Sequence, residues 1–570
     1  MLAGCQGVPT RPAQPLEQAQ ASEPPPARAL PFEEPAAATQ ELDEDLVFSY
    51  LVGEIGARAG QLRIALTHYL HAAMLARDPY AAERATRIAI RLKDYEQGLR
   101  AARRWVELAP NSLAARQLSG ILFLRNGQPQ LAREQFQAVL LIAESLGKDG
   151  MLQVAVALNG ERDRAAVLQL MRELLQQRAE DARAHYALAV VETGQQRYVE
   201  AEASLREAIR IQPEWAQPRV LLSRVLVALG RAQQGLRHLA AAVQDYPDDR
   251  LLRISYARLL VSSQQYAEAL EQFRQLHERA LDDVEVTYGY AMLATQQNAW
   301  EEARSLWQEL RNRPKYREEA TYFLAQVEEL SGNPELAIGL YRSVSDEEFQ
   351  VDAVMRMGSL LADRGQLAQA REAFAQARIA HPERVVDLYL AETQVLQNAG
   401  APRETVLGLY ALAIQAFPED NDLRYNRGLY YSDIAEYALM EADFKAVLAR
   451  DADNANALNA LGYMLADLGQ RLDEAYSYIS RALKLKPDNP AILDSLGWVY
   501  YRMGDYANAL KYLRRAAAGE PDDEISAHLG EVLWVSGERD EARSVWNKAL
   551  EFAPESEQLR SVMDRFLTEP

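Results

Sequence analysis

The chain has 570 residues, with 62 lysines and arginines against 82 aspartates and glutamates, and its net charge is −20. This charge disfavours a sequence-independent nucleic-acid binder, because such a protein needs a positive field to meet phosphates. Hydrophobic residues make up 48% and charged residues 25%, which is typical of a folded chain and excludes disorder throughout. The single cysteine, Cys5, excludes an intrachain disulfide and a zinc or iron–sulfur site built from several cysteines.

The first residues carry a short motif, Leu2-Ala3-Gly4-Cys5. It resembles the lipobox of bacterial lipoproteins, in which the signal is cut before the cysteine and the cysteine receives lipid. The resemblance implies lipidation of Cys5, and Gln6 in the following position implies delivery to the periplasmic face of the outer membrane. Only Met1 precedes the motif, whereas a secretory signal needs an apolar core of about 7–15 residues, so we expect that signal further upstream. The alternative is an accidental cysteine near a frayed terminus.

The segment after the motif has the composition of a linker. Eight of the 24 prolines fall between Gln6 and Gln40, among mostly Ala, Gln and Glu. Proline removes backbone donors and restricts φ, which disfavours both helix and sheet. We therefore predict a disordered, extended tether over residues 1–45.

From residue 46 to 556 the chain repeats with a period of 34 residues. Two copies, 351–384 and 490–523, share a glycine at position 8, a glycine at 15, alanines at 20 and 27, and a proline at 32. The apolar period on both sides of position 15 predicts two amphipathic helices in each copy. Position 15 is where a helix end favours a left-handed glycine, as at Gly60, Gly127, Gly230, Gly332, Gly365, Gly469, Gly504 and Gly537. Small residues at positions 8 and 20 predict that the two helices of a copy approach closely. A large residue at position 24 is predicted to fill the groove beside them.

This pattern resembles the tetratricopeptide-repeat family over nearly the whole body of the chain. The resemblance implies an all-α superhelical solenoid of about 15 repeats. We expect more divergent helical repeats over 46–181 and regular repeats over 182–556, with a capping helix in 557–570 that covers the last interface. Residues 147–181 keep helical periodicity but few signature residues, so they predict either a bend or a drifted repeat.

No sequence motif for catalysis is present: HExxH, GxxxxGK[ST], GxGxxG and GxSxG are all absent from the chain. His68 and His71 are spaced to share a helix face, but ordinary surface or packing roles are the favoured interpretation, since no third metal ligand is evident. Paired acids at repeat ends, such as Asp282-Asp283 and Asp522-Asp523, predict helix N-caps. We therefore expect no enzyme activity, no cofactor and no metal.

The repeat family lines its concave groove with positions 2, 5, 9, 12 and 13 of each first helix. Exposed Trp, Tyr and Arg side chains are typical binding anchors, although bulky residues at these positions can instead pack against neighbouring repeats. Both interpretations stay open for the candidate protein-binding groove, which consists of Tyr463, Asp467, Trp498, Tyr501, Arg502 and Trp534.

A lipid anchor, a tether and a long repeat array together resemble outer-membrane repeat lipoproteins that act as adaptors of periplasmic proteases. The resemblance implies a non-catalytic adaptor that binds and activates a carboxy-terminal processing protease and brings it substrates such as peptidoglycan hydrolases. The alternative is an assembly scaffold or pilotin for an outer-membrane secretion or polysaccharide-export machine. Neither function involves nucleic acid.

Overall fold

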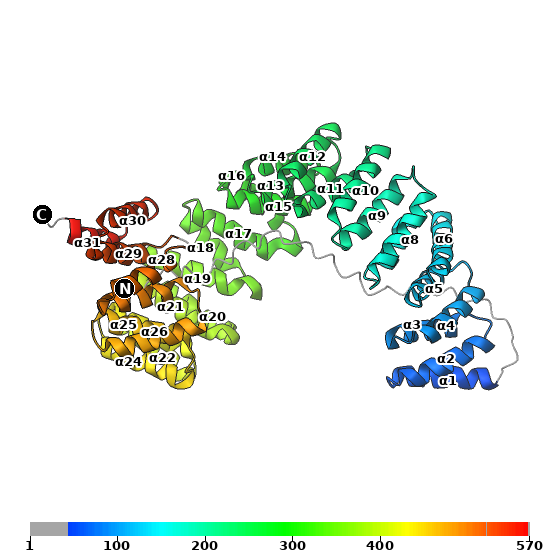
Figure 1. Cartoon of the computed structure of the whole chain (residues 1–570). Coiled ribbons are helices and arrows are strands. Elements are labelled where there is room, and N and C mark those ends of the chain that lie inside the picture. Colours follow the sequence, from blue (N-terminus) through cyan, green and yellow to red (C-terminus); the bar gives the residue numbers. More distant parts are fainter. Residues whose placement is uncertain (1–43, 520, 568–570) are drawn as a thin grey trace. The chain divides into compact units, whose positions relative to one another are not determined.

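A computed structural model describes residues 44–519 and 521–567 of the chain (Figure 1). In this part of the chain there are 31 α-helices, two short 3-10 helices and no strands. The helices form fifteen consecutive pairs followed by a single helix, α31 (Glu557–Leu567), in agreement with the predicted number of repeats. The predicted all-α repeat fold is therefore confirmed. Cys5 and the predicted tether lie outside the described residues, apart from the last residues of the tether at the start of α1.

The described chain divides into two compact units, and the boundary between them in the sequence falls within α16 (Trp300–Arg311), between Leu306 and Trp307. The first unit begins with α1 (Glu44–Arg58), and from α1 to α7 and again from α8 to α15 each helix packs against the next in the chain. Its other helices are α2 (Leu62–Leu75), α3 (Tyr80–Leu92), α4 (Tyr95–Leu108), α5 (Leu113–Arg125), α6 (Pro129–Ser145), α7 (Gly150–Leu158), α8 (Arg164–Gln176), α9 (Ala182–Gly194), α10 (Tyr198–Ile211), α11 (Ala216–Ala228), α12 (Ala232–Asp245), α13 (Arg250–Ser262), α14 (Tyr266–Arg279) and α15 (Val284–Gln296).

The second unit contains the rest of the array and ends with α31. Its earlier helices are α17 (Arg317–Leu330), α18 (Pro334–Ser343), α19 (Glu347–Asp363), α20 (Leu367–Ala380), α21 (Val385–Asn398), α22 (Arg403–Ala416), α23 (Asn421–Asp433) and α24 (Tyr437–Arg450). The last three pairs are α25 (Ala455–Asp467) with α26 (Leu472–Leu485), α27 (Pro490–Arg502) with α28 (Tyr506–Ala516), and α29 (Asp523–Ser536) with α30 (Arg539–Phe552). Figure 1 shows α29, α30 and α31 together at the C-terminal end of this unit.

The turn inside each helix pair depends on a left-handed residue. All eight glycines predicted for this role have positive φ, which confirms the prediction. Other repeats place a residue with a side chain in the same conformation, such as Ala435 with φ of 58°. A left-handed residue with a Cβ costs about 1–2 kcal/mol relative to the right-handed form, so the turn geometry is retained at a local cost in these repeats.

The two helices of a pair approach closely where a small residue faces a large one. A Cβ added to Gly530 on α29 would lie 2.0 Å from Nε1 of Trp546 on α30, and one added to Gly358 would lie 2.4 Å from Phe374. Both aromatic rings are completely buried. The predicted pairing of position 8 with position 24 is thus confirmed, and the large ring occupies the space that a side chain at position 8 would need.

Side-chain carboxylates cap the N-terminal ends of helices. Asp283 and Asp522 accept hydrogen bonds from the backbone N–H of Val286 and Ile525, which confirms the two acids as N-caps.

A second contact, which the sequence interpretation missed, joins neighbouring repeats. An arginine four residues into a first helix donates to the carbonyl of the proline that ends the preceding repeat. An example is Arg219, which reaches the carbonyl of Pro213 over 2.7 Å. The same contact joins Arg116 to Pro110, Arg253 to Pro247, Arg424 to Pro418 and Arg560 to Pro554.

Residues 147–181 form a helix pair with an unusually short first helix. Helix α7 has 9 residues, whereas α5 and α9 before and after it have 13. Met151 and Val154 of α7 share one apolar core with Leu168 and Met171 of α8. Helix α7 packs mainly on α6 and α9, and α8 also packs on α6 and α9, whereas α7 and α8 have few close backbone contacts with each other, so this segment departs from the regular helix pair. Of the helices in the described residues, none combines the length and apolar character needed to cross a bilayer.

Replacement of Ala435 by glycine should raise the free energy of unfolding by about 1 kcal/mol, because glycine adopts positive φ without the Cβ penalty. The measurement is urea unfolding of the whole chain, with hydrogen exchange of the α23–α24 segment as the local readout. Ala375→Gly, at an exposed site inside α20, is the matched control and should lower stability by about 1 kcal/mol. Loss of stability in both variants would contradict the left-handed assignment.

Gly530→Ala should destabilise the last repeats by about 1–3 kcal/mol, because the new methyl group would collide with Trp546. Trp546→Phe removes the atoms nearest to that methyl group and should itself cost stability through lost packing. In the double variant the two losses should be clearly less than additive, as measured by urea unfolding. Full additivity would show that the two residues do not share the space.

Candidate functional site

The candidate site lies on the first helices of the last three repeats. Helices α25, α27 and α29 pack side by side in that order, and α31 packs on α29. Each of the three begins at a side-chain N-cap, provided by Asn454, Asn489 and Asp522. All six residues predicted for the groove belong to these helices. Because the helices are neighbours, residues from three repeats come together on one surface.

The structure separates the six residues by exposure. Tyr463 and Trp498 are only 7% and 6% exposed, which favours the packing interpretation for these two residues over that of exposed anchors. Both rings pack between neighbouring first helices, which is the alternative that the sequence left open. Tyr501 and Trp534 are half-buried, whereas Asp467 and Arg502 are exposed. A role of these residues in binding a partner stays a prediction.

A buried polar cluster surrounds Tyr463 and Trp498. The indole of Trp498 stacks on the imidazole of His528, with 4.1 Å between ring centroids. Nδ1 of His528 lies 2.9 Å from a carboxylate oxygen of Asp494, and Nε2 lies 3.4 Å from the hydroxyl of Tyr463. That hydroxyl also donates to Glu524 over 3.0 Å. We call these five residues the histidine cluster.

The electrostatics of the histidine cluster favour protonation. Burial by itself lowers the pKa of His528, but the facing Asp494 carboxylate, with Glu524 and Glu531 nearby, raises this pKa overall. Burial also raises the pKa of the Glu524 carboxyl. Burial and the neighbouring Glu524 together raise the pKa of Tyr463 well above its ordinary value. An imidazolium at His528 is therefore stabilised by the carboxylates of two repeats.

Sequence reasoning missed His528, Asp494 and Glu524 because each is unremarkable within its own repeat. The signal that was available is the period itself, since Asp494 and His528 are 34 residues apart and so occupy equivalent places in adjacent repeats. An acid and a histidine one period apart on first helices are therefore candidates for contact.

Helix α31 contacts residues at one edge of the same surface. Tyr501 donates to Glu531 over 3.0 Å, and Arg565 of α31 donates to the other oxygen of the Glu531 carboxylate over 3.0 Å. The ring of Trp534 packs against Trp546 and Phe566. Helix α31 therefore orients the residues at one end of the surface.

Two buried polar atoms on this surface have no hydrogen-bond partner among the described residues, namely Nε1 of Trp498 and Oδ1 of Asn459. Such atoms are uncommon in folded proteins, because an unmet buried donor or acceptor costs about 1–3 kcal/mol. Nearby, Arg502 is anchored by a 2.8 Å hydrogen bond to the backbone carbonyl of Asp467. The surface thus offers an exposed guanidinium and an exposed carboxylate to a partner, whereas the two unpartnered atoms are buried.

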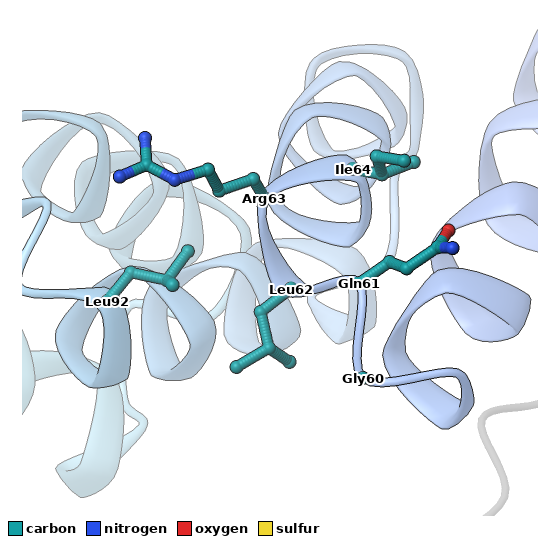
Figure 2. Close-up of a pocket in the computed structure, with 6 residues that line it drawn as sticks. All are labelled: Gly60, Gln61, Leu62, Arg63, Ile64 and Leu92. Carbon is teal, nitrogen blue, oxygen red and sulfur yellow. The ribbon is translucent and has the colours of Figure 1, made fainter.

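A shallow pocket of about 380 Å³ lies far from this surface in sequence, in the first unit. Figure 2 shows its lining, with Leu62 and Leu92 contributed by the start of α2 and the end of α3, and Arg63 beside them. The other lining residues are Gly60, Gln61 and Ile64. These six residues supply a guanidinium and an amide but no carboxylate, imidazole, thiol or hydroxyl, so this pocket has no group for acid–base or nucleophilic chemistry.

The histidine pair His68 and His71 lies on α2. The ring of His68 contacts Phe48 edge-on, with 5.7 Å between centroids. Among the residues that the structure describes, His, Cys, Asp and Glu do not gather in groups of three that would suit a metal ion.

Comparison with known proteins identifies the repeats. The tetratricopeptide-repeat family matches residues 156–214, 192–259, 226–287, 453–519 and 495–557. The TPR repeat-containing protein PA4667 of Pseudomonas aeruginosa is 38% identical over 208 residues, which cover 36% of this chain and 35% of that protein. Residues 156–287 and 453–557 of this chain are thus similar to tetratricopeptide repeats. Repeats of this family typically form non-catalytic scaffolds that bind other proteins.

Further relatives share the repeat rather than a whole sequence. Anaphase-promoting complex subunit 7 of Arabidopsis thaliana is 24% identical over 200 residues, which cover 35% of each protein. The chain thus spans about a third of the length of both relatives. The solved structure of the APC/C hetero-tetramer Cut9–Hcn1 covers 92% of this chain and 96% of its own, at 12% identity and a TM-score of 0.32.

The histidine cluster should make the last repeats more stable as the pH falls from 8 to 5. His528 has a raised pKa in the folded state, so its contribution is fully present below its ordinary value of 6.5 and is lost as pH rises through the folded-state pKa. Glu524 acts in the same direction, because protonation relieves the cost of burying its carboxylate. Hydrogen exchange of α27 and α29 in the whole chain, corrected for the intrinsic pH dependence, measures this trend.

His528→Gln should flatten this pH dependence, whereas His71→Gln at an exposed site should leave it unchanged. A trend that survives His528→Gln would assign it to other groups.

Proposed function

We propose that this tetratricopeptide-repeat protein is a non-catalytic, lipid-anchored adaptor on the periplasmic face of the outer membrane. It resembles LbcA, the lipoprotein adaptor of the carboxy-terminal processing protease CtpA. In this proposal the chain binds and activates such a protease and brings it substrates such as peptidoglycan hydrolases. The support comes from the lipobox-like Cys5, the proline-rich segment after it, the repeat array and the homology to a Pseudomonas repeat protein.

The observation that carries the proposal is the surface of α25, α27 and α29. It presents the exposed side chains of Arg502 and Asp467 together with the half-buried rings of Tyr501 and Trp534. A peptide of the partner that lies across the first helices would meet the guanidinium, the carboxylate and the accessible parts of the two rings. Binding of this kind needs no catalytic residue in the adaptor.

Adaptor action follows from tethering. When one scaffold holds a protease and its substrate, the second encounter becomes intramolecular, and its effective concentration can reach the millimolar range with a short flexible linker. The residues between Cys5 and α1 would let the array move near the membrane while lipid on Cys5 holds it there. The adaptor thereby raises the rate of proteolysis without new chemistry.

The test combines binding and proteolysis. Purified chain should accelerate cleavage of a peptidoglycan hydrolase by a carboxy-terminal processing protease. Asp467→Lys and Arg502→Glu each reverse an exposed charge of this surface, and each should weaken binding by roughly tenfold. Lys511→Glu on α28 is the matched control, since it makes the same charge change as Arg502→Glu on a second helix and should bind normally.

The outcomes separate the alternatives. The chain could instead copurify from envelope extract with a barrel protein or secretin and have no effect on proteolysis. That result would overturn the adaptor proposal in favour of an assembly scaffold or pilotin. Cys5→Ser should release the protein from membranes, and continued membrane association of that variant would overturn the lipid anchor.

A further inference from the structure

Helix α1 is the outermost helix of its unit. Figure 1 shows it beside α2 at the N-terminal end of the first unit, and its main packing partner is α2. The residues that it buries are Ser49, Gly53 and Gly56, which are small and let the two helices approach closely. The opposite side of α1 is therefore an end face of the repeat array.

This end face is apolar. Phe48, Leu51 and Ile55 are 59%, 57% and 66% exposed, although each is a large hydrophobic residue. With Glu44 before them and Arg58 after them they follow a spacing of 4, 3, 4 and 3 residues, which places all five on one side of the helix. We call these five residues the α1 stripe. Its spacing is that of the contact seam between two paired helices.

The last described helix, α31, has a different outer face. In the second unit, α31 buries Leu559 and Val562 against the last repeat, while Arg560 and Asp564 are exposed on it. A terminal repeat with a polar outer face is what keeps a solenoid end soluble. Contiguous exposed apolar side chains, by contrast, mark interaction sites. The contrast points to α1 as a surface that another element covers.

The order of residues in the α1 stripe points to the covering element. If a second α1 lies antiparallel across the first with Leu51 at the centre, Phe48 of each copy comes opposite Ile55 of the other. The same register brings Glu44, in the acidic first turn, opposite Arg58, in the basic last turn. The stripe is thus complementary to itself in both shape and charge, as a two-fold interface requires.

We propose that the α1 stripe is a homodimer interface, in which α1 of a second copy of this chain packs antiparallel on α1. One helix pair buries less than the roughly 1,200 Å² of a standard stable interface. The dimer therefore forms in the micromolar range and responds to protein concentration. This interface is independent of the peptide-binding surface proposed for the last repeats, and each can fail without the other.

The first experiment measures mass against concentration by sedimentation equilibrium of the full chain between about 1 and 200 µM. The wild type should pass from monomer to dimer, and Leu51→Asp should raise the dissociation constant at least tenfold, because each copy buries a carboxylate at the centre. Leu412→Asp on α22 is the matched control, since Leu412 is 60% exposed and lies outside the stripe. A wild type that stays monomeric throughout, or a dimer unaffected by Leu51→Asp, overturns the proposal.

A charge swap tests the antiparallel register. Glu44→Arg and Arg58→Glu should each weaken the dimer several-fold, because each places like charges opposite one another, and the double variant should restore it. Leu51→Cys in a Cys5→Ser background should crosslink to its own partner across the two-fold axis. A double variant that does not recover wild-type dimerisation would overturn this arrangement. A monomer in which its own chain shields the introduced thiol from maleimide would overturn it as well.

Discussion

The structure depends on one steric constraint, the close approach of two helices at a residue without a side chain. Where Gly530 faces Trp546 and Gly358 faces Phe374, the ring of the second helix fills the space of the missing Cβ. This contact sets the distance between the helices of a pair, and the left-handed residue at the turn sets their direction. Because one pair cannot bury both of its apolar faces, each pair needs the next, and the array follows from repetition.

Repetition also explains how the candidate site arises. The helices α25, α27 and α29 are equivalent elements of consecutive repeats, so residues one period apart become neighbours. Asp494 and His528 meet in this way, and Trp498 stacks on His528 because both lie on the same side of adjacent helices. The packing that stabilises the repeats therefore also concentrates carboxylates around one histidine. It leaves the indole N–H of Trp498 buried without an acceptor among the described residues.

The first and the last of the described helices differ in their outward faces. At the C-terminal end, α31 brings Arg565 to Glu531 and turns polar side chains outward. At the N-terminal end, Phe48, Leu51 and Ile55 of α1 remain exposed. A solenoid end resembles the edge of a sheet, in that the next repeating unit could always be added. A polar cap prevents such addition, whereas an apolar face permits it.

The sequence by itself determined the helix pairs, their number, the left-handed turns and the pairing of small with large residues, because these are local or lie within one period. It also placed Asp283 and Asp522 as caps, since an N-cap contacts only its own helix. Only the tertiary structure decided that Tyr463 and Trp498 are buried while Asp467 and Arg502 are exposed. Burial of a first-helix residue depends on the side chains that the next repeat brings beside it, and the pattern of a single repeat does not contain them. The histidine cluster could not be predicted from the sequence for the same reason. Its members come from three repeats and form one site only when the helices pack.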